Sequence, residues 1–327
     1  MCARAVLILS VLCLLACGGG GGALTGGSTG STTGGLGVPG LGAGVSLNGK
    51  QVFPSDNPWN QRVDTMAVDS NSDVYINSIG RATHLHPDFG SDPSYGIPYI
   101  IVAGTQPRVA VSFDYASESD PGPYPIPSNA PIEGGTNASG DRHVLVIDRD
   151  AWKLYEMFAA YPQSNGTWHA GSGAVFDLNS NALRPAGWTS ADAAGLPIFP
   201  GLVRYDEVVE HSAITHAIRF TVPSTQRGYI YPARHFASNS SDPALPPMGM
   251  RVRLKASVDI SAYPPEAKVI AQAMKTYGML LADNGSAWYF TGMTDTRWDD
   301  TQLNALKALT GNDLEVVQLG SITTGKR

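Results

Sequence analysis

Side chains able to transfer protons or bind anions are concentrated in residues 181–238. This stretch joins a segment with Gly and Pro breaks to a β-type run over residues 214–222, so its polar side chains are expected on loops and strand ends, where active sites are usually built. In an alternating strand, His216 shares a face with apolar side chains, which suits either a general acid/base or a core histidine with one hydrogen bond. The candidate catalytic residues are Asp206, Glu207, His216, Arg219, Arg234 and His235.

Two more candidates come from strand-like runs earlier in the chain. His143 opens the run 143–148, and Glu156 lies inside the run 153–158. A pair of carboxylates flanking the sugar bond is what glycoside hydrolysis requires. A His with an Arg and a Tyr is what a polysaccharide lyase requires, because the Arg neutralises the uronate carboxylate while the His or Tyr transfers the proton.

These residues leave two classes of function open. One is an enzyme that cleaves an extracellular polysaccharide, as a hydrolase or a lyase. The other is a non-catalytic carbohydrate-binding or envelope-structural protein, which the lack of G-x-S-x-G and H-E-x-x-H signatures favours. Six basic residues distinguish the two classes: Arg142, His143, His216, Arg219, Arg234 and His235. In an enzyme their side chains are expected to line one cleft. If they are scattered over the molecule, the binding protein is favoured.

Metal binding is a weaker expectation. Loops that begin at Asp69 and Asp177 offer oxygen at their first, third and fifth positions, but both lack the Gly and Glu of an EF-hand. Asn- and Asp-rich turns account for these loops as well as a metal does. The segment His84-Leu-His86-Pro-Asp88 could place three ligands on one face of an extended chain. Calcium therefore stays open, and no cofactor is firmly implied.

The first residues of the chain predict export and lipid anchoring. An apolar run over residues 5–16 follows Arg4 and is too short to span a bilayer, but it has the length of a signal-peptide core. The run ends in Leu14-Leu15-Ala16-Cys17, which resembles the lipobox of bacterial lipoproteins. The resemblance implies that residues 1–16 are removed, that Cys17 carries lipid, and that Gly18 after it favours the outer membrane.

Residues 17–44 are expected to form a flexible tether, because they are dominated by Gly, Ser, Thr, Leu and Ala and contain no charge. The three cysteines are Cys2 and Cys13 in the leader and Cys17 at the lipidation site. The mature body therefore contains no free thiol, which excludes a disulfide framework, a thiolate metal site and a Cys nucleophile.

Residues 45–319 are predicted to form a single globular domain, with residues 258–319 as a small α/β flank. The chain has 28 acidic residues against 22 Lys and Arg, for a formal net charge of −6, which argues against nucleic acid as a partner. The expected partners are the membrane, through the lipid on Cys17, and a polysaccharide.

Hydrophobic patterning predicts a mainly β body, arranged as a sandwich or jelly roll, with two short helices in the C-terminal third. The helices are expected over residues 265–277 and 300–309, where apolar residues recur at helical spacing or capping residues flank the segment. A hairpin turn is expected at Asp148-Arg149-Asp150. The predicted strands are 98–103, 108–114, 143–148, 153–158, 173–178, 214–222, 228–231, 251–257 and 279–282.

Four segments of the body resemble a family of secreted bacterial proteins of unassigned activity. The segments are Asp141-Arg-His-Val, Arg184-Pro-Ala-Gly-Trp-Thr-Ser-Ala-Asp192, His216-Ala-Ile-Arg-Phe220 and Pro232-Ala-Arg-His235. The resemblance spans most of residues 55–318 and implies an exported protein, but it implies no mechanism.

Overall fold

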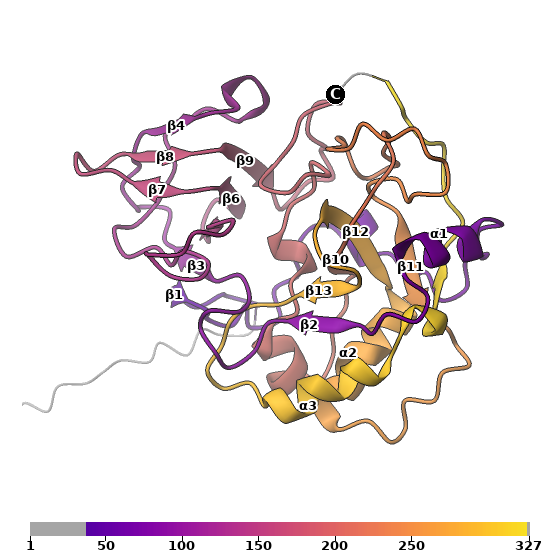
Figure 1. The fold of residues 1–327 in the computed structure, drawn as a ribbon. Coiled ribbons are helices and arrows are strands. Elements are labelled where there is room, and N and C mark those ends of the chain that lie inside the picture. The colour runs from indigo at the N-terminus through magenta and orange to yellow at the C-terminus, as the bar shows by residue number, and fades with distance from the viewer. Residues whose placement is uncertain (1–36, 326–327) are drawn as a thin grey trace, which may run out of the picture. The chain divides into compact units, whose positions relative to one another are not determined.

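A computed structural model describes residues 37–325, and it confirms the mainly β body with few short helices. The strands form three sheets of five, six and three strands (Figure 1). The predicted lipobox, Cys17 and most of the predicted tether lie outside the described residues. Among the residues described, no helix is long and apolar enough to cross a membrane.

The five-stranded sheet is buried on both faces. In order across the sheet, its strands are β1 (Gly42–Ala43), β3 (Tyr99–Val102), β5 (Val144–Asp148), β6 (Lys153–Phe158) and β9 (Ser172–Asp177). Alternate β5 residues enter different cores: Leu145 packs into the larger hydrophobic cluster, and Val146 into a smaller one. Burial of both faces explains the unbroken apolar runs. β5 and β6 pair antiparallel, which confirms the predicted hairpin.

The three-stranded sheet covers the smaller cluster and is exposed on its other face. Its strands, in order, are β4 (Val111–Phe113), β8 (Trp168–Ala170) and β7 (Tyr161–Pro162). Trp168 and Ala170 are buried in the cluster, whereas the intervening His169 is partly exposed. This alternation of buried and exposed residues is the ordinary pattern of a sheet with one solvent-exposed face.

The six-stranded sheet combines segments from both ends of the chain. In order, its strands are β14 (Leu314–Val316), β11 (Arg251–Leu254), β12 (Met279–Asn284), β10 (Ile218–Val222), β13 (Tyr289–Thr291) and β2 (His86–Asp88). β10 pairs in parallel with β12, and β2 pairs in parallel with β13. The strands from residues 258–319 are therefore integral members of this sheet.

Two predicted strands differ from the structure. The run expected from residue 214 becomes a strand only at Ile218, because the Ala217 amide donates to the Trp59 carbonyl at 2.7 Å instead of joining the sheet. His216 therefore precedes the strand. Residues 228–231 make isolated bridges through Tyr229 to Met248 and Thr323 and form no strand, so the strand predicted there is wrong.

Both predicted helices are present, and α2 (Pro265–Thr276) packs against β11 and α3 (Figure 1). The second expected helix comprises α3 (Asp300–Asn304) and a 3-10 turn (Ala305–Ala308), with Asp299 as its N-cap. An additional helix, α1 (Ser72–Ile79), lies outside the C-terminal third. The remaining helical turns are Pro58–Asn60, Ala116–Glu118, Phe199–Gly201 and Gly311–Asp313, and a π-helical turn covers Asp206–Glu210.

The described part of the predicted tether is joined to the body. β1 pairs antiparallel with β3 at the edge of the five-stranded sheet. The Tyr99 hydroxyl donates to the Val45 carbonyl at 2.7 Å, and the Leu47 amide donates to Asp206 at 2.8 Å. Folded structure therefore extends from residue 37, upstream of the expected boundary at residue 45.

Candidate functional site

A cleft of about 380 Å³ is lined by residues of both larger sheets. Four carboxyl groups line it, those of Glu118, Asp141, Asp192 and Asp283, together with the imidazole of His235. We call this cavity the acidic cleft. Residues far apart in the sequence meet here: Asp141, the segment 189–193 and His235 line the cleft, together with Asp283 and Asn284.

Asp192 and Asp283 form a pair of neighbouring carboxyl groups held by Arg219. The guanidinium of Arg219 donates to both Asp192 oxygens, at 2.6 and 2.5 Å, and to the Thr291 hydroxyl at 2.7 Å. It lies 3.9 Å from Asp283. Asp192 is buried, whereas a quarter of the Asp283 side chain is exposed to the cleft. Asp283 is therefore the member of the pair that a ligand can reach.

The Asp283 carboxyl group is harder to ionise than an ordinary Asp. Burial, followed by the charge of Asp192, raises the pKa of Asp283 to about 7, against the opposing effect of Arg219. The Asp283 oxygens accept from the amides of Ala193 and Asn284, at 3.2 and 2.6 Å. Two neighbouring carboxylates do not both ionise easily, so one holds a proton near neutral pH. A carboxyl group with a pKa near neutral, exposed at a cleft wall, has the properties that a general acid requires.

A tight turn over residues 188–195 presents Asp192 to this pair. The Ser190 hydroxyl donates to the carbonyls of Asp192 and Leu196, at 3.0 and 2.5 Å. Gly195 has φ +68°, and a Cβ there would lie 2.5 Å from the Trp188 carbonyl oxygen. The turn therefore requires glycine at this position.

A second wall of the acidic cleft comes from the 3-10 turn at Ala116–Glu118. The Glu118 carboxylate accepts from the Thr189 amide at 3.3 Å and lies 4.0 Å from His235 Nε2. Arg184 fixes this wall, because its guanidinium donates to the carbonyls of Thr189 and Glu118, at 2.7 and 2.8 Å. His235 Nδ1 faces the Ala193 carbonyl at 2.6 Å. Glu118 thus supplies a second positioned carboxylate.

His143 lies behind the acidic cleft and does not line it. The buried ring lies 2.7 Å from Glu133 through Nδ1 and 3.1 Å from the Ala191 carbonyl through Nε2. Burial alone would lower its pKa, but the charge and hydrogen bond of Glu133 raise the pKa of His143 to about 9. The imidazolium therefore holds the carbonyl next to Asp192 in place, and the direct catalytic role expected for His143 does not fit its position.

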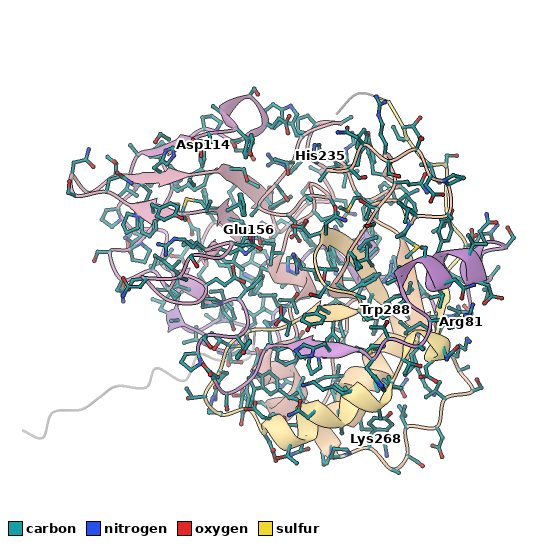
Figure 2. All side chains as sticks on the ribbon, in the orientation of Figure 1. Arg81, Asp114, Glu156, His235, Lys268 and Trp288 are labelled. Carbon is teal, nitrogen blue, oxygen red and sulfur yellow. The ribbon has the colours of Figure 1, made fainter. Side chains whose placement is uncertain are left out.

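Glu156 is fully buried and has a structural role. Its carboxyl oxygens accept from the amides of Ile198 and Phe199, at 2.9–3.0 Å, at the start of the Phe199–Gly201 turn. Burial raises the pKa of Glu156 to about 7, against these hydrogen bonds. Figure 2 shows Glu156 well away from His235. The expected role in a sugar-binding groove does not fit this burial.

A second group of predicted residues surrounds a different cavity, of about 480 Å³. His216 Nε2 lies 3.1 Å from Glu207, and its Nδ1 faces the Ala217 carbonyl at 2.8 Å. Glu207 also accepts from Arg204 at 2.5 Å. Burial opposes ionisation of Glu207, but the charges of Arg204 and His216 hold its pKa below the usual range. Asp206 accepts from Ser46 and Leu47, which ties down the N-terminal segment.

The expected single basic cleft is therefore not formed. His235 lines the acidic cleft, Arg219 and His143 lie behind it, and His216 lines the other cavity. Arg234 donates to the Arg184 carbonyl at 2.9 Å. Arg142 donates, at 2.8–3.2 Å, to the carbonyls of Thr136, Ala138 and Ala160.

Metal-ligand geometry is not found among residues 37–325, where no three His, Cys, Asp or Glu side chains gather suitably. His84 Nδ1 faces the Lys307 carbonyl at 2.7 Å, and His86 stacks on Tyr289 with ring centroids 4.1 Å apart. Asp69 begins the turn that leads into α1, where it accepts from the Asn71 amide. The turn interpretation of this loop therefore fits the structure.

Sequence reasoning missed Glu118, Asp141 and Asp283 as site residues. Asp283 and Asn284 end the apolar strand β12, and a polar pair at such a strand end is the local signal that could have indicated Asp283. Glu118 lies in a polar turn with no comparable signal.

Comparison of the chain with family models, with curated proteins and with solved structures finds no match.

Replacing His216 with Ala is expected to lower the free energy of unfolding by about 2–3 kcal/mol, because the buried Glu207 loses a partner. His211→Ala is the matched control, since His211 lines the same cavity but is exposed. Urea denaturation measures both. A His216→Ala variant as stable as the control would contradict the structural role.

The free energy of unfolding is expected to fall, by a few kcal/mol in order of magnitude, as pH rises from 5 to 9. Folding raises the pKa of Asp283 from 3.8 and of Glu156 from 4.5 to about 7, and that of His143 from 6.5 to about 9. The folded state therefore holds protons that the unfolded chain releases. Urea denaturation at several pH values measures this slope, and Glu156→Gln should flatten it below pH 7. A stability maximum near pH 8 would contradict the assignment.

Proposed function

We propose that the protein hydrolyses a glycosidic bond of an extracellular polysaccharide in the acidic cleft. The observation that carries the proposal is the placement of the partly exposed Asp283 beside the buried Asp192, in one cleft with Glu118; burial and the charge of Asp192 raise the pKa of Asp283 to about 7. Glycoside hydrolysis needs one carboxyl group that is protonated near neutral pH and a second that is ionised. Asp283 and Glu118 are both presented to the same cleft.

In this proposal, Asp283 protonates the leaving oxygen of the sugar and Glu118 serves as the second carboxylate. Asp192 acts through Asp283 as a positioning residue, because its negative charge keeps the proton on Asp283 until substrate binds. The exposed aromatic ring of Tyr115, 57% accessible, lines the same cleft and offers a surface on which a sugar ring stacks.

The arrangement favours a hydrolase over a lyase. A lyase needs a cation directed at the uronate carboxylate. Arg219 is engaged by Asp192 and Thr291, Arg184 by carbonyl groups and Asp120, and Arg234 by the Arg184 carbonyl. The guanidinium groups near the cleft are thus directed toward partners inside the protein.

The test is to incubate the full chain, purified in detergent, with neutral, amino-sugar and uronate polysaccharides. New reducing ends without unsaturated products are expected. Unsaturated products would indicate a lyase instead. Binding without new reducing ends from any polymer would favour the alternative function, a non-catalytic carbohydrate-binding or envelope-structural protein.

We also propose that the protein is an outer-membrane lipoprotein anchored through Cys17, as its lipobox and the following Gly18 support. Cys17→Ser is expected to abolish incorporation of labelled palmitate, because the thiol is the acceptor of lipid. Cys13→Ser in the leader is the matched control and should leave labelling intact. Undiminished labelling of the Cys17→Ser variant would contradict the proposal.

A further inference from the structure

The charge of the acidic cleft is unbalanced once its internal pairs are taken into account. Asp192 is neutralised by Arg219 at 2.5–2.6 Å. Asp283 is largely protonated below pH 7. Glu118 and Asp141 also line the cleft, with side chains that are one-third exposed and exposed, respectively. The wall of the cleft is therefore negative.

Lys and Arg side chains do not offset this charge. Arg142, next to Asp141 in the chain, turns away from the cleft and stacks on Tyr161, with its guanidinium 4.3 Å from the ring centroid. The imidazole of His235 faces Glu118 at 4.0 Å and the Ala193 carbonyl. Lys and Arg are absent from the described residues that line the cleft.

We infer that the acidic cleft selects amino sugars with free ammonium groups, such as glucosamine units, over neutral sugars and over uronates. The inference rests on the proposed hydrolytic function and adds its substrate class. An ammonium group gains Coulomb energy beside Asp141 and Glu118, whereas a uronate carboxylate is repelled by them. The exposed ring of Tyr115 adds a surface that attracts cations as well as sugar faces.

Asp141 is the residue best suited to test this selectivity. It lines the cleft, it is exposed, and its backbone carbonyl accepts from the Ala159 amide at 2.8 Å, so replacing the side chain leaves the local backbone contact in place. It has no part in the proposed proton transfer. Asp141→Asn should therefore lower kcat/KM for an amino-sugar substrate more than for a neutral one.

The experiment compares three β-1,4-linked hexamers, of glucosamine, N-acetylglucosamine and glucose, at low and high salt. For the wild-type chain, kcat/KM is expected to be about 10-fold higher for the glucosamine hexamer at low salt, and the preference should shrink at high salt because exposed charges are screened. Asp141→Asn should reduce the preference about 5-fold.

Binding to the Asp283→Asn variant separates the two proposals. If this variant binds the glucosamine hexamer more tightly than the glucose hexamer, the selectivity holds whatever the rate of hydrolysis. Equal binding of the two hexamers at low salt, or a preference that Asp141→Asn leaves intact, would overturn the inference. Hydrolysis of glucose polymers alone would also overturn it while leaving the proposed hydrolase in place.

Discussion

Replacing Asp283 with Asn is expected to reduce hydrolysis by about 10²–10⁴-fold, the usual contribution of a general acid. An amide keeps a hydrogen-bond donor toward Asp192 but cannot deliver a proton to a leaving sugar. Because Asn imitates the neutral carboxyl group that Asp283 holds near pH 6, the folded state should tolerate it. The reducing-end assay measures the loss, and thermal denaturation at pH 6 checks the fold.

Stability at higher pH gives a second readout of the same change. Above pH 7 the wild-type protein must ionise Asp283 beside Asp192, a cost that the Asn variant avoids. The variant should therefore be more stable than the wild type at pH 8. Asp177→Asn serves as control, because Asp177 is exposed at the end of β9. Full activity of the Asp283→Asn variant would show that a residue other than Asp283 is the general acid.

Replacing Arg219 with Met is expected to lower the free energy of unfolding by about 3–5 kcal/mol, because Asp192 is then left buried without its cation. Arg297→Met is a suitable control. Arg297 also pairs with acidic residues but is half exposed, and exposed ion pairs contribute about 0–1 kcal/mol.

The double variant Asp192→Asn with Arg219→Met should recover a large part of the lost stability, since neither buried charge remains. Urea denaturation of the four proteins gives the coupling energy between the two residues. The bidentate contact predicts a large coupling energy. If the destabilisations of the two single variants simply added up in the double variant, this prediction would be wrong.

Local sequence signals predicted the elements whose identity depends on neighbours in the chain. The runs that became β3, β5 and β6 are apolar and rich in β-branched residues, and their limits were predicted within about a residue. The Pro-initiated α2 was equally clear. α1 was not predicted, since its short amphipathic pattern lies in an Asn- and Asp-rich stretch that also suits turns.

Long-range partners account for what the sequence did not predict. His216 was expected on a strand. The residue after it, Ala217, instead donates its amide to the Trp59 carbonyl, so the strand begins only at Ile218. The sequence placed Arg219 and Arg234 among the candidate residues of one stretch, yet only tertiary structure shows that Arg219 is engaged by Asp192 and Arg234 by the Arg184 carbonyl. The pairing of Asp192 with Asp283 joins a turn to a distant strand end, for which a single sequence carries no periodic signal.

The parallel pairing of β2 with β13 has a consequence for how the chain is made. His86 pairs with Tyr289, and Val68 forms a bridge with Val317. Segments that are synthesised early therefore cannot form these β pairings until the last part of the chain has been made. Contacts of such large sequence separation slow folding, typically to milliseconds or seconds, and unpaired strand edges invite association meanwhile. The strand edge of β2 therefore stays unpaired, and open to association with other chains, until the segment that contains Tyr289 has been synthesised.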